Sequence, residues 1–228
     1  MGGFIRQSLN GKDLRVRNLR ASRAPLLPAD ALGPFQILLF LCPLALFLNA
    51  GCAALFGYKI HAPGLFSDEF SQRIASVNER IALYLPPEAL TYQSKDKGGR
   101  MADPQTYYVG EALGPMLVEG FQAGFNEFIF LETEPTTDVM KRYAIPRAVV
   151  VRVKDFQNRV TLKGQAVGLV TEAVVLDPGL HLLARFESRG TSDARKVFAK
   201  RGGPEVNLNA VIENNVLAMI QQLQDWKG

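Results

Sequence analysis

The sequence has few of the residues that form covalent crosslinks or metal sites. It contains two cysteines and two histidines among 228 residues. Both cysteines, Cys42 and Cys52, precede residue 53, so the rest of the chain has no thiol for a disulfide or a cysteine-based metal site. The histidines, His61 and His181, are 120 positions apart, and a zinc site built on them would need carboxylate ligands. We expect no metal and no cofactor.

Sequence motifs of the common enzyme classes are missing as well. No G-x-S-x-G, P-loop or G-x-G-x-x-G pattern occurs. Carboxylates at Glu132, Glu134, Asp155 and Glu172 could act as acid and base in glycoside cleavage, but no spacing in the sequence brings two of them together. We therefore expect a protein that is not an enzyme, with a small cell-wall glycan hydrolase as the alternative.

Net charge is confined to the N-terminal part of the chain. The whole sequence carries +4, but residues 1–34 hold six basic and two acidic groups, whereas residues 59–228 hold 20 of each. The basic character therefore belongs to an N-terminal tail and not to a surface that could bind nucleic acid. We expect no nucleic-acid partner.

Residues 35–58 form one long uncharged segment, 24 residues without a charged side chain. A basic tail before such a segment is typical of signal peptides and of membrane anchors that obey the positive-inside rule. At ~1.5 Å per residue, a helix of this length spans ~36 Å, which is enough for a hydrocarbon core of about 30 Å. A buried core helix rarely contains so long an uncharged segment. The segment therefore predicts membrane targeting.

Near the end of this segment, Leu48-Asn49-Ala50-Gly51-Cys52 resembles the lipobox of bacterial lipoprotein signal peptides. The resemblance implies that signal peptidase recognises the first four residues, and that Cys52 receives lipid, palmitate included, and becomes the new N-terminus. Ala50 and Gly51 match the pattern, whereas Asn49 stands where an aliphatic residue is usual. An uncleaved transmembrane helix is the second interpretation, which the apolar residues after Cys52 favour. Both interpretations place the rest of the chain outside the inner membrane.

Four segments follow from these patterns. Residues 1–34 are a basic n-region or a disordered cytoplasmic tail, and residues 35–58 are the signal peptide or anchor. Residues 59–78 combine Pro63-Gly64 with polar residues and predict a linker. Residues 79–228 predict one periplasmic domain, since the chain after residue 58 is long enough for a single core.

Within this domain, strand and helix patterns alternate. We predict strands at 79–85, 128–132, 147–156, 160–176 and 180–188, and helices at 107–126, at 135–146 with Thr137 as N-cap, and from Pro204 to the end. Charged loops are predicted at 93–106 and 189–203. Asp177-Pro178-Gly179 is typical of a turn, and Gly164 and Gly168 suggest a bulge or tight bend. On the strand after this turn, Leu180, Leu182, Ala184 and Phe186 are expected on one face.

The two long helices are expected to pack through apolar stripes. In the first, Val109, Leu113, Leu117, Phe121 and Phe125 recur every four residues, and the last helix has an equivalent stripe from Leu208 to Trp226. The glycines of the first helix predict close approach to strands; they are Gly110, Gly114, Gly120 and Gly124. The fold class is therefore α+β, a mixed or antiparallel sheet of about four to five strands with two main helices on one face, preceded by an apolar signal or anchor helix.

Three short sequence segments within residues 79–226 resemble segments of small bacterial envelope lipoproteins. They are Gly110-Glu111-Ala112-Leu113 leading to Phe121, the run Val149-Val150-Val151-Arg152-Val153-Lys154-Asp155-Phe156, and the Asp177-Pro178-Gly179 turn. The layout is similar to the auxiliary lipoproteins of ABC-type lipid transporters, to the outer-membrane lipopolysaccharide-assembly lipoprotein and to the N-terminal-TolB-like domains of peptidoglycan-synthase activators. The resemblance implies a non-catalytic auxiliary or binding component of an envelope transport or assembly system.

The expected location is the periplasmic face of the inner or outer membrane, with the chain held by lipid or by its N-terminal helix. The expected partners are an envelope protein complex and a lipid ligand, and the oligomeric state stays open. A structural lipoprotein of a motor or secretion ring is a further alternative. Basic residues on the last strand and loop are candidates for contact with headgroups or with an acidic partner: Arg185, Arg189, Arg195, Lys196, Lys200 and Arg201.

Overall fold

The structure is a computed structural model that describes residues 57–97, 104–161, 164–192 and 203–226. The apolar segment 35–58 lies almost wholly outside these residues, as does the lipobox from Leu48 to Cys52. No helix in the described part of the chain is long and apolar enough to cross a membrane. The elements are, in order, β1 (Tyr58–Ile60), α2 (Phe70–Arg73), β2 (Val77–Tyr84), α3 (Pro87–Leu90), β3 (Ser94–Asp96), β4 (Gln105–Tyr107), α4 (Val109–Gly124), β5 (Phe125–Leu131), α5 (Thr137–Arg142), β6 (Ala148–Thr161), β7 (Gly164–Leu176), β8 (Leu182–Thr191) and α6 (Pro204–Asp225).

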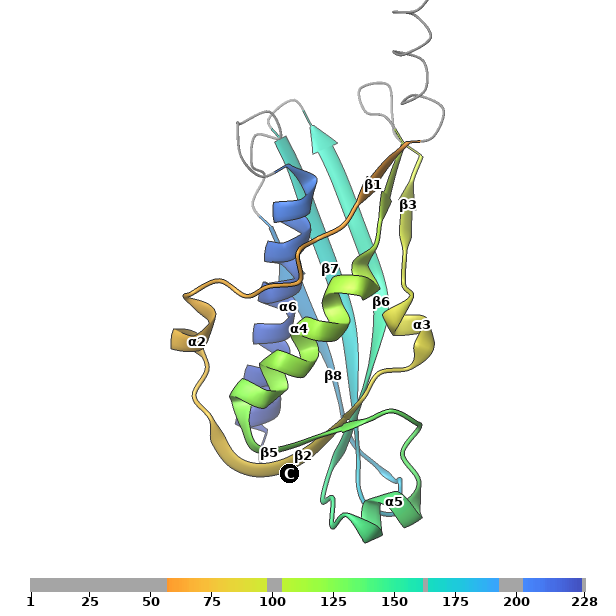
Figure 1. Cartoon of the computed structure of the whole chain (residues 1–228), viewed down its shortest axis with the longest axis vertical. Coiled ribbons are helices and arrows are strands. Elements are labelled where there is room, and N and C mark those ends of the chain that lie inside the picture. Colours follow the sequence, from red (N-terminus) through yellow and green to blue (C-terminus); the bar gives the residue numbers. More distant parts are fainter. Residues whose placement is uncertain (1–56, 98–103, 162–163, 193–202, 227–228) are drawn as a thin grey trace, which may run out of the picture. The chain divides into compact units, whose positions relative to one another are not determined.

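The main sheet has five strands in the order β5-β2-β6-β7-β8 (Figure 1). Strand β2 pairs in parallel with both β5 and β6, whereas β6, β7 and β8 form an antiparallel meander. The sheet is therefore mixed, as predicted, and the α+β class is confirmed for the described residues. Its two edges are β5 and β8.

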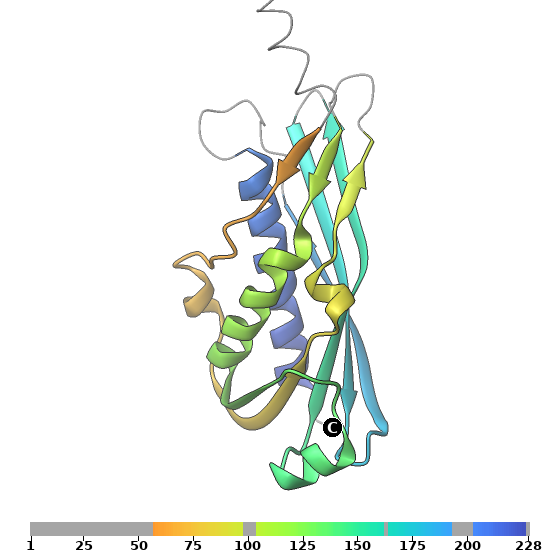
Figure 2. The same cartoon turned by 45° about the vertical axis from the view of Figure 1, so that its right-hand side comes forward.

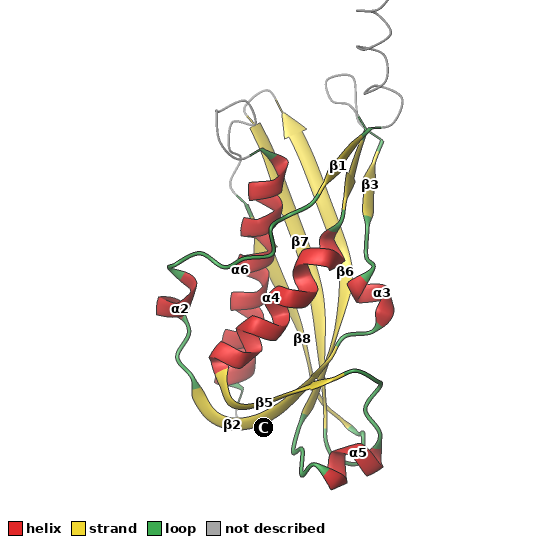
Figure 3. Ribbon diagram, viewed as in Figure 1, coloured by secondary structure: helices red, strands yellow, loops and turns green. Residues whose placement is uncertain are grey.

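Helices α4 and α6 cover one face of this sheet (Figure 3). The predicted apolar stripes of both helices are in the core, where Leu117, Phe121, Ile212 and Val216 have no exposed surface. Burying a side chain of this size stabilises the fold by about 1.5–3 kcal/mol. The two-helix layer on the sheet is thus the principal core of the domain.

The glycines of α4 lie against other helices and not against strands, contrary to the prediction. A Cβ atom on Gly110 would lie 2.5 Å from the carbonyl oxygen of Ala89, in α3. A Cβ atom on Gly124 would lie 2.7 Å from the Ile220 side chain, in α6. The absent side chains therefore set how closely α4 packs on its neighbouring helices.

Helix α5 packs on the opposite face of the sheet, where it covers a second and smaller apolar cluster that includes Ala82, Met140 and Ala148. Alternate residues of β2 and β6 point to opposite faces, so Ile81 and Val149 join the main core while Ala82 and Ala148 join the second. The N-cap of α5 is Thr136, whose Oγ1 accepts a hydrogen bond from the Val139 N–H at 3.3 Å. The prediction of Thr137 was wrong by one residue.

The segment predicted as a linker, 59–78, is part of the folded domain. The amide N–H groups of Gly64 and Leu65 donate to Asn209 Oδ1 at 3.1 and 3.3 Å, and Ser67 donates to Glu213. These bonds fasten the segment along α6. It also contains β1 and α2, and Phe70 of α2 is buried.

The range predicted as a charged loop, 93–106, contains strands β3 and β4. They pair antiparallel and, with β1, form a separate three-stranded sheet in the order β1-β4-β3. Tyr107, at the end of β4, is buried and its hydroxyl contacts Gln165 of β7. Burial raises the pKa of this hydroxyl well above its ordinary value of 10.0. This contact joins the small sheet to the main one.

Two predicted strand details also differ. The irregularity of the β6–β7 ladder lies between Val153 and Asp155, whereas Gly168 pairs regularly. Gly164 is the first residue of β7 and has a φ of 145°. In β8, Leu182 is 56% exposed because the register shifts beside Leu176, so only the later residues of the predicted apolar face point into the core.

Candidate binding groove

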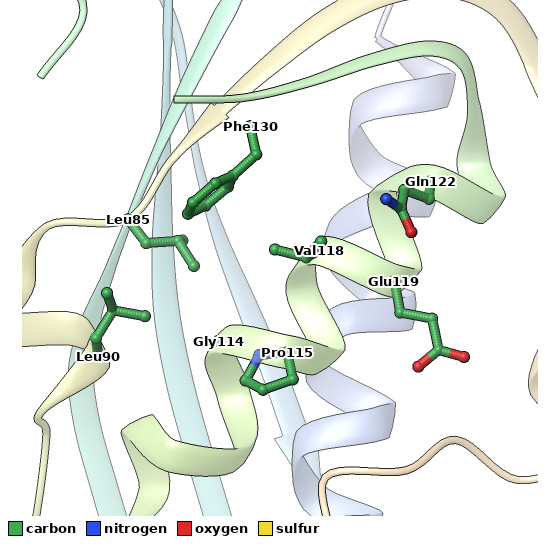
Figure 4. A pocket seen from close by; sticks show the side chains of 8 residues that line it. All are labelled: Leu85, Leu90, Gly114, Pro115, Val118, Glu119, Gln122 and Phe130. Atoms are coloured by element: carbon green, nitrogen blue, oxygen red, sulfur yellow. The ribbon is translucent and has the colours of Figure 1, made fainter. Parts of the chain in front are cut away.

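An apolar groove lies between α4 and strand β5 (Figure 4). Its volume is about 580 Å³, which falls within the range of about 300–1,000 Å³ typical of small-molecule sites. It is shallow and mostly open to solvent. Eight residues line it: Leu85, Leu90, Gly114, Pro115, Val118, Glu119, Gln122 and Phe130.

The groove exists because the side of α4 that faces away from α6 is only partly covered. Leu117 and Phe121 are buried in the main core, whereas Pro115 is exposed and Val118 is half-buried. Strand β5 contributes Phe130, and the segment around α3 contributes Leu85 and Leu90. Three separate parts of the chain therefore form the walls.

Two large apolar side chains at the groove are accessible to solvent. Phe130 is 41% exposed and Leu90 is 39% exposed. Gly114 permits the position of Leu90, since a Cβ atom there would lie 2.8 Å from Leu90 Cδ2. Each Å² of apolar surface that a ligand covers here contributes about 25 cal/mol to the free energy of binding. The groove thus favours an apolar ligand.

The polar groups of the groove are few. Glu119 supplies the one carboxylate and Gln122 the one amide among the lining residues. General acid–base catalysis by a carboxylate pair needs two such groups near each other. The lining contains a single carboxylate and no histidine, cysteine, lysine or arginine.

The carboxylates considered in the sequence occupy other places. Glu172 lies on the face of the sheet opposite to α6, where its Oε1 is 3.5 Å from Lys154 Nζ and 3.4 Å from Arg185 Nη1. Asp155 accepts a hydrogen bond from Gln157. No group of three His, Cys, Asp or Glu residues suited to a metal occurs within the described ranges.

The two histidines each lie beside one carboxylate. His61 Nδ1 is 2.8 Å from Glu111 Oε2, and the His61 ring stacks on Tyr108 at 4.2 Å. His181 Nδ1 is 3.1 Å from Asp177 Oδ2 in the β7–β8 turn. The Asp177 carboxylate accepts hydrogen bonds from the N–H groups of His181 and Gly179, and these bonds lower its pKa below the ordinary value of 3.8.

Two of the predicted contact residues are described. Arg185 pairs with Glu172, and Arg189 Nη2 is 3.6 Å from Glu187 Oε2. The other four lie outside the described residues: Arg195, Lys196, Lys200 and Arg201. Neither described arginine lines the groove.

The sequence did not identify the groove. The only available signal was the run Phe128-Ile129-Phe130-Leu131, in which four consecutive apolar side chains exceed what one buried face needs. Phe128 packs on the main core and Ile129 on the second, which leaves Phe130 at the groove. That distribution depends on the two-sided packing of β5.

No protein-family model matches the chain, and no curated protein matches its sequence. Among solved structures, the PelC dodecamer from Paraburkholderia phytofirmans is 10% identical, with 73% of this chain and 95% of that chain covered and a TM-score of 0.38. The lipoprotein GNA1162 from Neisseria meningitidis is 7% identical, with coverage of 65% and 100% and a TM-score of 0.34. A putative neuraminyllactose-binding hemagglutinin homolog from Helicobacter pylori is 7% identical, with coverage of 72% and 90% and a TM-score of 0.34. Similarities of this size establish neither the family nor the function of this chain.

Proposed function

We propose that this chain is a membrane-anchored lipoprotein of the bacterial cell envelope. In this proposal it binds an acyl chain of a lipid, as a non-catalytic auxiliary component of an envelope transport or assembly system. The observation that carries the proposal is the open apolar groove between α4 and β5, with the exposed side chains of Phe130 and Leu90.

The chemistry of the groove fits an acyl chain better than a polar ligand. Its walls are mainly aliphatic and aromatic, and the lining has no cation for an anionic headgroup. Each methylene group that the groove covers would contribute about 0.8 kcal/mol, from which the costs of association and chain ordering are subtracted. Such binding is reversible, as a component that accepts and releases lipid requires.

The anchor is supported by the uncharged segment 35–58 and by the lipobox-like residues before Cys52. Intact mass spectrometry of the membrane-extracted protein, beside Cys52→Ala, tests it. We expect a mass that corresponds to residues 52–228 plus acyl chains, and loss of that species in the variant. A full-length, unmodified mass would replace the lipid anchor by a transmembrane helix.

Photo-crosslinking tests the groove. The full chain in its membrane is exposed to a phospholipid that carries a diazirine in one acyl chain, and crosslinked peptides are mapped after irradiation. We expect crosslinks in α4 and β5, and their loss in Val118→Glu, which places a charge in the groove. Ala123→Glu, which adds the same charge at an exposed position of α4 outside the lining, is the matched control.

Phe130→Gln provides a second variant, because this side chain is exposed and its replacement leaves the main core intact. Phe130→Gln should unfold at a urea concentration close to that of Ala123→Glu, whereas Val118→Glu should unfold at a lower one, because Val118 is half-buried against the main core. Crosslinks that persist in both variants, or that spread evenly over the domain, would refute acyl-chain binding in the groove. Selective crosslinking of a copurified protein to the groove, with no lipid adduct, would assign the groove to a polypeptide partner.

A further inference from the structure

One end of the domain gathers exposed basic and apolar side chains. Strand β1 begins there, since Tyr58 pairs with Gln105 at the start of β4 (Figure 2). The end of β6 lies beside these strands, because Asn158 Nδ2 donates to Asp96 Oδ2 at 2.8 Å. The start of α6 is adjacent as well, since Asn207 Nδ2 donates to the carbonyl of Gln165 at 3.4 Å. We call this end, with the seven exposed residues named next, the β1 end.

Four exposed cations belong to the β1 end: Lys59, Lys95, Lys97 and Arg159. Three exposed apolar or aromatic side chains accompany them: Tyr58 at 52%, Val160 at 39% and Val206 at 40%. Its described acidic residues are Asp96, to which Asn158 donates, and Glu205. The described charge of this end is therefore positive, although residues 59–228 are neutral as a whole.

Several cations elsewhere on the domain are held by carboxylates, although Lys141 and Arg142 of α5 are in no ion pair with a described residue either. On the face of the sheet opposite to α6, Lys154 and Arg185 are held by Glu172, and Arg147 is held by Glu79 at 3.2 Å. None of the four cations of the β1 end forms an ion pair with another residue that the structure describes.

The β1 end is also where the chain comes from its anchor. Tyr58 follows Cys52 by six positions, and at most ~3.6 Å per residue an extended segment of that length spans about 20 Å. If the anchor is instead an uncleaved helix within residues 35–58, it ends before Tyr58, which is the first residue of β1. Under both interpretations the β1 end is confined to the neighbourhood of the bilayer.

We propose that the β1 end docks on the anionic headgroups of the membrane that anchors this chain. The occupant is a phospholipid surface, because an anionic surface complements the cations and the headgroup region accommodates a tyrosine and exposed valines. The N-terminal anchor keeps the domain at a high local concentration near the membrane, so the cations need only favour one orientation of the domain on its surface. The opposite end, which carries α5 and the β7–β8 turn, then projects away from the membrane toward a partner (Figure 1).

This inference deepens the proposed function and rests on its anchor, but not on lipid in the groove. Lysine labelling tests it on the full chain reconstituted in nanodiscs, either of phosphatidylcholine alone or with 30% phosphatidylglycerol. The reagent is a water-soluble acylating ester, and mass spectrometry gives the rate at each lysine. Lys141, exposed in α5 at the opposite end, is the internal control.

We expect the labelling rates of Lys59, Lys95 and Lys97 to be about fivefold lower in the anionic nanodiscs than in the neutral ones, because one favourable interaction of a cation with the surface has an effect of this size. The labelling rate of Lys141 should be unchanged. A concentration of 1 M NaCl should remove the difference, because the Debye length falls to about 3 Å. In Lys95→Gln/Lys97→Gln, labelling of Lys59 should return toward its rate in the neutral nanodiscs. Lys141→Gln should retain the protection.

Equal rates in the two kinds of nanodisc, or equal slowing at Lys141, would overturn the docking proposal. Protection in native membranes but not in anionic nanodiscs would also overturn it, and would indicate a protein on the β1 end. A chain that does not enter nanodiscs or membranes at all would refute the anchor and therefore the proposed function. Failure of the anchor and failure of docking are thus distinguishable.

Discussion

Replacing Asn215 by leucine should destabilise the domain by about 3 kcal/mol, because this side chain makes three buried hydrogen bonds. It lies on α6 with no exposed surface. Its Oδ1 accepts from Thr171 Oγ1 at 2.8 Å, and its Nδ2 donates to the carbonyls of Leu169 at 3.2 Å and Ser188 at 2.8 Å. One amide therefore joins the helix to both β7 and β8.

The magnitude follows from what the substitution leaves behind. Leucine has a similar shape, so the volume change is small and the loss comes from the three bonds, at ~1 kcal/mol each. The Thr171 hydroxyl is fully buried and would lose its partner on α6. The better helix propensity of leucine offsets at most about 0.5 kcal/mol.

The neighbouring Asn214 provides the matched control. Its Nδ2 makes a single, exposed hydrogen bond to the carbonyl of Thr191 at 3.0 Å. Asn214→Leu carries the same change in helix propensity and should cost less than about 1 kcal/mol. The difference between the two variants isolates the buried contacts.

Urea unfolding of the full chain in detergent micelles measures both variants. The fluorescence of Trp226 is a suitable probe, because this residue packs on Phe186 at 5.9 Å and lies under Arg147 at 5.0 Å. Circular dichroism should give the same midpoint if unfolding is two-state. Equal free energies of unfolding for the two variants would refute the assignment of Asn215 as the polar link between helix and sheet.

Two further predictions concern the sheet and its turn. Gly190→Ala should lower the free energy of unfolding by about 1–3 kcal/mol, because its Cβ atom would lie 2.0 Å from the Val211 carbonyl oxygen. Gly168→Ala, with open space at that position, should be neutral or slightly stabilising. Similar urea midpoints for the two variants would contradict the close packing of α6 on β8. The lowered pKa of Asp177 means that this carboxylate contributes stability above pH 3.8, and that the contribution is lost as the pH falls through the folded-state value. The urea midpoint of Asp177→Asn should therefore depend less on pH below 4 than that of the wild type, and an unchanged pH profile would exclude the turn as a source of acid sensitivity.

Local patterns predicted the long helices and strands correctly, because the apolar side chains on the buried face of each element recur with the period of that element. The four-residue spacing of Leu113, Leu117 and Phe121 places α4 on the core, and the alternation in β6 and β7 places both strands in a meander. The charge distribution and the uncharged segment 35–58 could likewise be identified without a structure, since both are properties of the local composition.

The predictions failed where a segment depends on partners far along the chain. Strand β1 is three residues long and pairs with β4 some 47 positions later, so no local period marks it. Residues 64–67 have the composition of a linker, yet Asn209 and Glu213 satisfy their polar groups. Short polar segments become ordered only when distant residues supply the hydrogen bonds.

The sequence by itself determined the uncharged character of segment 35–58, the α+β class and the faces of the two long helices, because each is encoded in neighbouring residues. Only the tertiary structure decided the small sheet, the groove at Phe130 and Leu90 and the cations of the β1 end. Each of these depends on which elements are adjacent, and adjacency follows from the packing free energy of the whole domain, which no local pattern encodes.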